Sequence, residues 1–172
     1  IATQNPLDLV GTYPLPTPQL DRFLFKISMD HIDREAELEV LDSIKERKRL
    51  LGNQHKVNRD DVLKARETIF TQINIDQAIK TTLVDISTNL RKDERVLQGN
   101  STRSMVLLLP ALQVRAAIRG RSYVSSEDIE NLIPEVLNHR IELVPGVNDF
   151  DKVLQDNMER PLEELAKSTL TK

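Results

Sequence analysis

The sequence contains no cysteine and no tryptophan, and only 3% of its 172 residues are aromatic. Without cysteine the chain forms no disulfide and offers no thiolate to a metal. This composition is typical of a reducing compartment, so we expect a cytoplasmic protein. The scarcity of aromatic residues disfavours a surface that stacks nucleic-acid bases. The net charge of −3 gives no general attraction to nucleic acid or to anionic lipid, so neither is expected as a partner.

Three further absences exclude other classes of function. The longest apolar run, Met105–Leu109 with its extension to Leu112, is far shorter than the roughly 20 residues of a membrane span. The histidines, His31, His55 and His139, lie far apart and have no acidic partner at metal-ligand spacing, so we expect no metal site. No glycine begins a G-x-x-x-x-G-K-[ST] phosphate loop. The chain therefore lacks the usual loop for holding a triphosphate.

The first 29 residues are predicted to belong to an α/β structure. Ile1–Thr3 predicts a short strand, which leads to the polar side chain of Asn5 and is stopped by Pro6. Open α/β sheets present polar groups to a ligand at the ends of their strands, so Asn5 is a candidate site residue. A proline-rich loop then leads to Arg22, and Phe23–Ile27 predicts a second strand.

From Ile32 onward the apolar residues follow helical spacing. Capping residues and glycines divide this region into seven predicted helices: from Asp33 to about Leu51, from Asn58 to about Ile73, from Asp76 to Lys92, from about Thr102 to Gly120, from Ser125 to about Leu137, from Asp149 to Met158, and from Pro161 to Leu170. Arg140–Val144 predicts a short extended piece. The residues expected to face inward are Ala36, Val40, Leu41, Ile44, Val62, Ala65, Ile69, Phe70, Ile73, Ile79, Leu83, Ile86, Leu90, Met105, Leu108, Leu109, Leu112, Ala116, Ile129, Leu132, Ile133, Val136 and Leu137.

Two prolines, Pro110 and Pro134, fall inside predicted helices. Each costs about 3 kcal/mol unless the helix accommodates a kink. The apolar stripes continue in register past both prolines, so we retain both helices. The sequence therefore predicts a mainly α protein, with a helical bundle over residues 30–172 preceded by a short α/β piece over residues 1–29.

Four stretches resemble motifs of the MoxR family of AAA+ ATPases. ATQNP at residues 2–6 is similar to the family's sensor 1 strand, and GTYPLPTPQLDRF at residues 11–23 is similar to its arginine-finger segment. GNSTRS at residues 99–104 looks like its sensor 2 turn, and QVRAAIRGRSYVSSEDI at residues 113–129 looks like part of its lid. The resemblance implies that residues 1–29 are the C-terminal stub of an AAA+ core and that residues 30–172 are the α-helical lid domain.

The resemblance also implies roles for three side chains. Asn5 would hold the attacking water in line with the γ-phosphorus of ATP. Arg22 would enter the nucleotide site of the neighbouring subunit and stabilise the charge that develops on the phosphoryl oxygens. Arg103 would contact the nucleotide phosphates of its own subunit from the first turn of a helix.

Each of the three side chains has a structural alternative. Asn5 can simply end a strand, and Arg103 can be an exposed arginine at the start of a helix. Arg22 can pair with Asp21 within a turn, a contact worth about 0–1 kcal/mol. If Arg22 is the finger, we expect Asp21 to orient the segment rather than to act on nucleotide.

ATP and Mg²⁺ are the implied cofactors. Because the chain starts inside a predicted strand and without methionine, we take it as a fragment whose Walker A and B motifs lie upstream of Ile1. On its own it is expected not to hydrolyse ATP. The implied parent is an ATPase that forms a homo-oligomeric ring, a hexamer by resemblance. It would act as a chaperone that remodels or matures partner proteins, often ones with a von Willebrand A domain.

Other interpretations stay open. The ATPase subunit of magnesium chelatase also presents an L-D-R-F segment, and a non-enzymatic helical interaction module is possible. A helix-turn-helix DNA binder would need a basic reading face, which the helix after Ser125 lacks. The basic run Lys45–Arg49 is interpreted as a solvated helix end. The cluster of Arg115, Arg119 and Arg121 is interpreted as a solvated or interface surface.

Overall fold

The computed structural model describes residues 1–3, 15–44, 46 and 56–170. The chain divides into two compact units, one containing Ile1–Lys26 and Ile69–Lys172 and the other containing Ile27–Thr68. The described residues are mainly helical, as the sequence predicts. The domain boundary expected at residue 29 stays a prediction.

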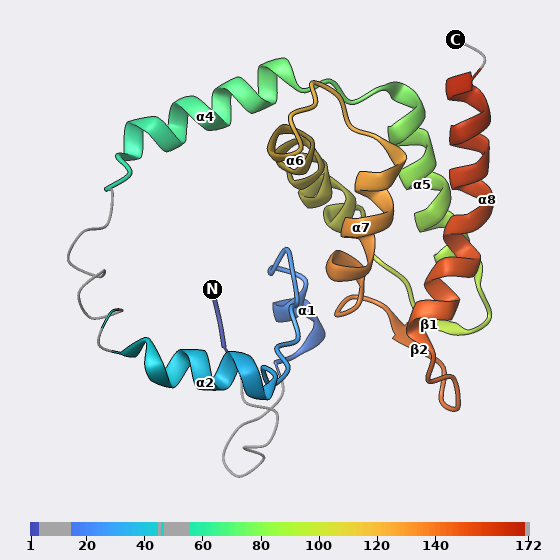
Figure 1. The fold of residues 1–172 in the computed structure, drawn as a ribbon. Helices are drawn as coiled ribbons and strands as arrows, with labels where there is room; N and C mark the ends of the chain where they lie inside the picture. Colours follow the sequence, from blue (N-terminus) through green and yellow to red (C-terminus); the bar gives the residue numbers. More distant parts are fainter. Residues whose placement is uncertain (4–14, 45, 47–55, 171–172) are drawn as a thin grey trace. The chain divides into compact units, whose positions relative to one another are not determined.

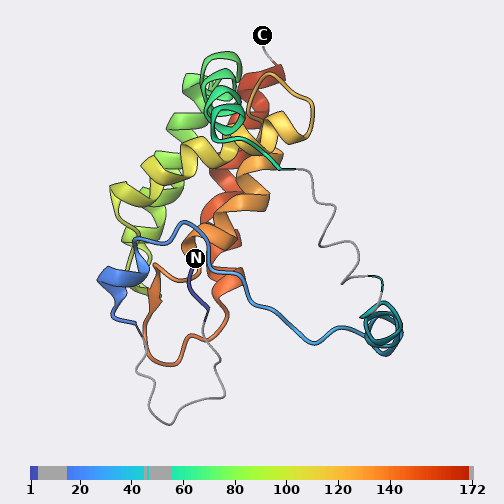
Figure 2. The same cartoon turned by 90° about the vertical axis from the view of Figure 1, so that its left-hand side faces the viewer.

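The larger unit is a helical bundle with one small sheet (Figure 1). Its elements are α1 (Thr17–Leu20), α5 (Gln77–Lys92), β1 (Val96–Gln98), α6 (Thr102–Ile118), α7 (Ser126–Leu137), β2 (Glu142–Leu143) and α8 (Phe150–Leu170). Helix α5 packs against α8, α6 packs against α7, and α7 also contacts α8 (Figure 2). Strands β1 and β2 pair antiparallel, with Val96 opposite Leu143 and Gln98 opposite Glu142.

The bundle helices begin and end at the signals in the sequence. The Asp76 carboxylate caps α5 by accepting a 2.8 Å hydrogen bond from the backbone N–H of Ala78. Ser125 and Asp128 form a reciprocal capping box at the start of α7. Gly120 follows α6 with a φ of +71°, a left-handed conformation that favours glycine. These three predicted boundaries are confirmed.

One continuous apolar core lies between α5, α6, α7 and α8. Its largest fully buried apolar side chains are Ile86, Leu90, Leu108, Leu112, Ile129, Ile133, Val136 and Leu137. All eight were expected to face inward from helical spacing. Met105, Leu109 and Leu132 are half-buried against the same core. The periodicity of this region therefore predicted both the helices and their buried faces.

Prolines lie inside three helices of the bundle: Pro110 in α6, Pro134 in α7 and Pro161 in α8. The first two are as predicted, whereas the prediction of two separate helices around Pro161 is wrong. Proline has no N–H for the carbonyl four residues earlier, here that of Asn157. The side-chain amide of Asn89 donates to that carbonyl at 3.3 Å and thus replaces part of the missing interaction.

The extended segments differ from the prediction. Ile1–Thr3 and Phe23–Ile27 were predicted as strands but have no strand structure. A strand needs a pairing partner, whereas the N–H of Lys26 donates to the carbonyl of Glu135 in α7 at 3.2 Å. Strand β1 was not predicted because three residues carry too little pattern. Strand β2 confirms the extended piece expected within Arg140–Val144.

The smaller unit contains α2 (Arg34–Asp42) and the start of α4 (Arg59–Gln72), which ends in the larger unit. The Asp33 carboxylate caps α2 by accepting from the N–H of Ala36 at 2.8 Å, as predicted. Helix α2 ends at Asp42 with Ser43 as its C-cap, Ile44 and Glu46 beyond it are again helical, and the end expected at about Leu51 lies outside the described residues. The stop signal expected at Gly52-Asn53 lies outside the described residues.

Neither α2 nor α4 contains a buried residue. The expected inward positions in these helices (Ala36, Val40, Leu41, Val62, Ala65, Ile69 and Phe70), and Ile44 just after α2, are exposed or half-exposed. The prediction of buried faces is therefore wrong here. Helical periodicity shows that one face is apolar, but burial also needs a second element to cover that face.

Candidate functional site

Asp21 and Arg22 lie in a tight turn that follows α1. The N–H of Arg22 donates to the carbonyl of Gln19 at 3.2 Å, and the N–H of Phe23 donates to that of Leu20 at 3.0 Å. The side chain of Arg22 is exposed, whereas that of Asp21 is only 27% exposed. The two adjacent charged side chains therefore differ in exposure: Arg22 faces solvent, whereas Asp21 is largely covered.

Asp21 is held by Arg140, a residue in the turn after α7 that is 4% exposed. The Arg140 Nε donates to Asp21 Oδ1 at 3.0 Å, and its Nη atoms donate to the carbonyls of Leu24 at 3.0 Å and Asp21 at 3.1 Å. The carbonyls of Phe23 and Val136 accept the remaining bonds. A guanidinium has five N–H donors, so these five bonds use all of them.

Two more contacts fix the same segment. Nε2 of His139 donates to the carbonyl of Phe23 at 2.9 Å, since a carbonyl can only accept. The N–H of Lys26 donates to the carbonyl of Glu135. We call residues 21–26 the anchored segment. It lies against the C-terminal end of α7 and is bonded there through both backbone and side chain.

Burial lowers the pKa of both anchoring side chains, but it changes the charge state of only one of them. Burial lowers the pKa of Arg140. The hydrogen bond that Arg140 donates to the Asp21 carboxylate opposes this shift, whereas the nearby charge of Arg103 adds to it. The pKa of arginine lies so far above the physiological range that Arg140 stays a cation. Burial likewise lowers the pKa of His139, and the charges of Arg140 and Lys26 act in the same direction. His139 is therefore neutral at pH 7, which agrees with a single donated hydrogen bond.

The start of α6 faces the same carboxylate. The hydroxyls of Ser101 and Ser104 lie 3.5 Å from the two carboxylate oxygens of Asp21, which is a long contact for a hydrogen bond. Arg103 lies between the two serines and is exposed. Asp21, Arg103 and Arg140 are therefore neighbours in space, although up to 119 residues separate them in sequence.

A buried polar network shapes the turn that precedes α6. The Asn100 amide donates to Ser87 Oγ at 2.9 Å, and Arg91 donates to that hydroxyl at 2.7 Å and to the Asn100 carbonyl at 3.0 Å. A Cβ added at Gly99 would lie 2.8 Å from Cγ of Arg91. Glycine is therefore required for this close approach.

The structure brings some of the predicted site residues together. Arg22 and Arg103 are both exposed, and Asp21 beside Arg22 contacts the serines that flank Arg103. Asn5 lies outside the described residues. His139 and Arg140 were missed as positioning groups because His139 was weighed only as a metal ligand. The available signal was Arg140 close after the apolar stripe of α7, where a cation suits the helix end.

The arginine cluster at the end of α6 was interpreted wrongly for two of its members. Arg121 makes two bonds of 2.7 and 2.8 Å to the carboxylate of Asp128, and Nε of Arg115 lies 3.2 Å from the same group. Asp128 is fully buried. Its burial would raise its pKa, but the bonds from Arg121 and Ser125 outweigh that effect and hold the pKa below its ordinary value.

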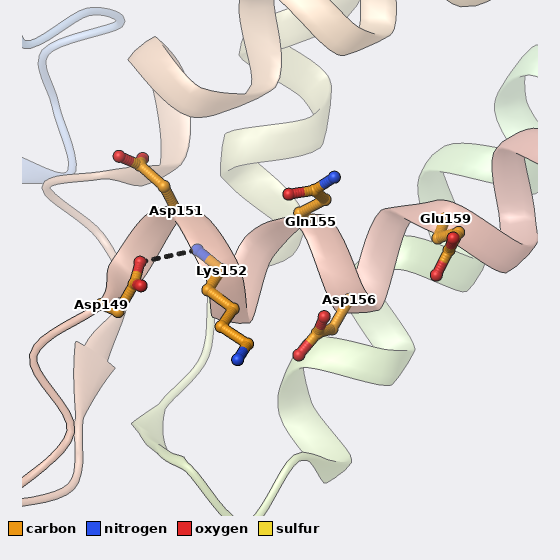
Figure 3. Close-up of a pocket in the computed structure, with 6 residues that line it drawn as sticks. All are labelled: Asp149, Asp151, Lys152, Gln155, Asp156 and Glu159. Atoms are coloured by element: carbon orange, nitrogen blue, oxygen red, sulfur yellow. Dashed lines mark hydrogen bonds between the residues drawn. The ribbon is translucent and has the colours of Figure 1, made fainter.

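An acidic depression of about 560 Å³ lies along the outer face of α8 (Figure 3). Its lining residues are Asp149, Asp151, Lys152, Gln155, Asp156 and Glu159. Two of the carboxylates already have local partners: Asp149 accepts the N–H of Lys152 at 2.9 Å, and Asp156 accepts from Arg95 at 2.7 Å. Within the described part of the chain no three acidic, histidine or cysteine residues are grouped to hold a metal. The depression is therefore not a candidate site.

No helix in the described ranges is both long and apolar enough to cross a membrane. Comparison with known proteins then defines the class to which the bundle belongs. A family model described as "AAA lid domain" matches residues 88–161, which run from within α5 to Pro161 in α8. Most of the bundle, from the end of α5 to the middle of α8, therefore matches the AAA lid domain.

Named relatives narrow the class. The chain is 38% identical over 151 residues to the uncharacterized protein YeaC of Bacillus subtilis, covering 84% of this chain and 45% of that protein. It is 33% identical over 154 residues to the chaperone MoxR1 of Mycobacterium tuberculosis, covering 83% and 40%. It is 26% identical over 165 residues to the protein MoxR of Methylorubrum extorquens, covering 84% and 47%.

A solved structure supports the same assignment. The crystal structure of an ATPase candidate from Cytophaga hutchinsonii matches with a TM-score of 0.76 and 27% identity, covering 91% of this chain and 51% of that one. Over most of its own length the chain is therefore similar to MoxR proteins, and residues 88–161 match the AAA lid domain. It spans somewhat under half the length of the curated relatives that it matches.

Proposed function

We propose that this chain is the C-terminal part of a MoxR-type ATPase that binds ATP with Mg²⁺ and remodels or matures partner proteins as a chaperone. It would work in the cytoplasm as a homo-oligomeric ring, with proteins carrying a von Willebrand A domain among its substrates. The similarity to the relatives named chaperone MoxR1 and protein MoxR, and the match to the AAA lid domain, support this proposal. The Walker motifs would lie in the part of the relatives that this chain does not cover. The chain alone is therefore expected to release no phosphate from ATP.

The proposed chemistry assigns one task to each site residue. Asn5 orients the attacking water, Arg103 contacts the phosphates of the nucleotide in its own subunit, and Arg22 acts on the nucleotide of the next subunit. An arginine stabilises the transferring phosphoryl group through its fixed charge and needs no proton transfer. Arg103 adds a cation at a helix N-terminus, where free N–H groups already favour an anion.

The observation that carries this proposal is the exposed side chain of Arg22 on a firmly anchored segment. A residue that acts on a neighbouring subunit must be accessible, yet its backbone must be fixed, because a misplacement of about 1 Å costs about 100-fold in rate. The two residues on either side, Asp21 and Phe23, have their carbonyls bonded to Arg140. Arg22 combines both properties.

The test uses the full-length protein that contains this chain. We expect Arg22→Ala to lower kcat by about 10³-fold or more while nucleotide affinity stays within about twofold. Arg119→Ala removes another exposed arginine from the same unit and is expected to leave kcat unchanged. Phosphate release and binding of a fluorescent ATP analogue provide the two readouts.

Mixing variants tests whether the arginine acts between subunits. Arg22→Ala and Arg103→Ala rings should each be inactive, whereas a mixture should regain turnover. An active pair forms wherever an intact Arg22 faces a subunit with an intact Arg103. A loss of nucleotide affinity with normal turnover in Arg22→Ala would contradict the assignment, as would the absence of any recovery on mixing.

A further inference from the structure

The buried guanidinium of Arg140 makes most of its bonds outside the bundle. Of its five acceptors, only the carbonyl of Val136 belongs to a bundle helix. The other four are the carboxylate and carbonyl of Asp21 and the carbonyls of Phe23 and Leu24. We infer that Arg140 is a positioning residue for Arg22, which it fixes to the end of α7 through the backbone on both sides. This inference rests on the proposed function of Arg22.

The balance of burial and bonding supports a positioning role. A buried charge is costly unless every donor finds an acceptor, and removal of one partner leaves that cost uncompensated. Here the anchored segment supplies four of five acceptors, so Arg140 is satisfied only while residues 21–24 stay docked. The hydrogen bonds of Arg140 therefore form only when the segment docks. This coupling favours a single position for the segment.

The same contacts join the segment to the lid as a whole. Asp21 accepts from Arg140 after α7 and lies 3.5 Å from the hydroxyls of Ser101 and Ser104 at the start of α6. Arg103 leaves the bundle between those serines. A rotation of the bundle therefore carries Arg22 and Arg103 together, and Arg140 transmits that motion to the backbone of residue 22.

Lysine cannot replace this residue. An ammonium is a compact group with three donors, whereas the planar fork of Arg140 reaches acceptors on residues 21, 23, 24 and 136 simultaneously. Arg140→Lys keeps the positive charge but loses the planar set of guanidinium donors, and Arg140→Gln loses both the charge and that set of donors. The two variants separate the contribution of bonding geometry from that of charge.

The matched control is Arg121→Gln. Arg121 also forms a two-bond ion pair with a carboxylate in the bundle, but its hydrogen-bond acceptors are Tyr123 and Asp128, and neither lies in residues 21–26. It should therefore destabilise the bundle without releasing the anchored segment. A purely structural role for Arg140 predicts that both variants behave alike.

The first measurement is amide hydrogen exchange in the full-length protein. In Arg140→Gln and Arg140→Lys, exchange in residues 21–26 should rise at least about tenfold, because the N–H of Lys26 loses its place beside Glu135. The N–H of Asn74, which bonds Ser122 within the bundle at 2.8 Å, should be unchanged. In Arg121→Gln, amide exchange in residues 21–26 should not rise relative to exchange at the N–H of Asn74. Unchanged exchange at residues 21–26 in the Arg140 variants would overturn the inference.

The second measurement is steady-state ATP hydrolysis by the full-length ring. Arg140→Gln and Arg140→Lys should lower kcat at least about tenfold with little change in nucleotide affinity. The double variant Arg22→Ala/Arg140→Gln should be no slower than Arg22→Ala alone, because the position of an absent side chain has no effect. Additive losses, or equal losses in Arg121→Gln, would overturn the inference.

The experiments also distinguish a failure of the proposed function of Arg22 from a failure of the inference about Arg140, and they allow for Arg140 variants that do not fold. If Arg22→Ala hydrolyses ATP normally, the proposed function of Arg22 fails, whereas amide exchange still reports whether Arg140 anchors the segment. If the Arg140 variants do not fold, Asp21→Asn removes the ion pair from its half-exposed side. That variant should show the same selective exchange and the same loss of kcat. A folded Asp21→Asn protein with normal kcat would overturn the inference.

Discussion

The two units of the chain contain similar helical patterns but differ in what those patterns bury. In the larger unit, α5 to α8 enclose a continuous core whose central leucines and isoleucines have no exposed surface. In the smaller unit, α2 has a good N-cap and an apolar stripe, yet none of its residues is buried. The N-cap of α2 is as good as that of α5, since the carboxylates of Asp33 and Asp76 each accept a 2.8 Å hydrogen bond from a backbone N–H.

The difference shows that helix formation and burial are separate properties of a sequence. A cap and helical spacing act within one segment, whereas burial depends on what the rest of the chain brings to that face. The bundle helices pack against one another and so cover one another's apolar faces. Leu38 and Leu41 of α2 are 46% and 60% exposed. The comparison predicts where substitutions affect stability.

The largest difference is expected from one leucine in each unit. Leu112 in α6 is 0% exposed, whereas Leu41 in α2 is 60% exposed. Leu112→Ala should lower the free energy of unfolding by about 2–5 kcal/mol, because it removes buried contacts and leaves a cavity. Leu41→Ala should have no measurable effect. Urea unfolding followed by circular dichroism gives both values, and a loss in Leu41→Ala comparable to that in Leu112→Ala would break the comparison.

A smaller difference is expected from one ion pair in each unit. Asp128 is fully buried between Arg115 and Arg121, whereas both side chains of the Arg34–Glu35 pair are about 80% exposed. Asp128→Asn should lower the free energy of unfolding by about 2–4 kcal/mol, because the two arginines lose their shared carboxylate and Ser125 loses its capping partner. Glu35→Gln should have no measurable effect.

The same unfolding measurement checks this second pair. A small loss in Asp128→Asn would mean that water replaces the carboxylate and that the pair is less buried than the structure indicates. A loss in Glu35→Gln would indicate that α2 is more highly ordered by its charges than its exposure implies. Either result would reduce the expected difference between the two units in how much an ion pair contributes to the free energy of unfolding.

Much of the fold could be predicted because its determinants are local. Asp76, Ser125 and Gly120 mark helix ends through their own chemistry, and the stripe around Ile129 and Ile133 has one period throughout. Pro161 misled the prediction because the compensating donor, Asn89, lies on another helix. A tertiary contact of that kind has no signature in the local sequence.

The candidate site was predictable only in part. Arg22 and Arg103 stand in motifs that can be read in order along the chain, and their functional roles remain predictions. Arg140 and His139 act on a segment more than 100 residues away, through hydrogen bonds to backbone carbonyls. Backbone acceptors are identical at every residue, so the sequence carries no mark of which carbonyl a buried arginine will bind.

The smallest predicted effect is on the pH dependence of the free energy of unfolding. It compares His139 in the larger unit with His31 in the smaller unit. Burial lowers the pKa of His139 below its ordinary value of 6.5, with Arg140 and Lys26 contributing and Asp21 opposing. The stabilising contribution of the neutral ring is complete above pH 6.5. As the pH falls further, the unfolded chain binds a proton that the folded protein does not bind until its lowered pKa is reached. Stability is therefore lost on acidification in this window.

The two carboxylates with lowered pKa values, Asp93 and Asp128, do not account for a loss in that range. The pKa values of Asp93 and Asp128 are lowered from 3.8, so their contributions are lost only at more acidic pH. His139→Gln keeps an N–H donor for the carbonyl of Phe23 but cannot titrate, so the free energy of unfolding should change less between pH 6.5 and 5 than in the parent. The control is His31→Gln, which replaces an exposed side chain in the smaller unit and should leave that pH dependence unaltered. If the slope persists in His139→Gln, the acid sensitivity originates outside the anchored segment.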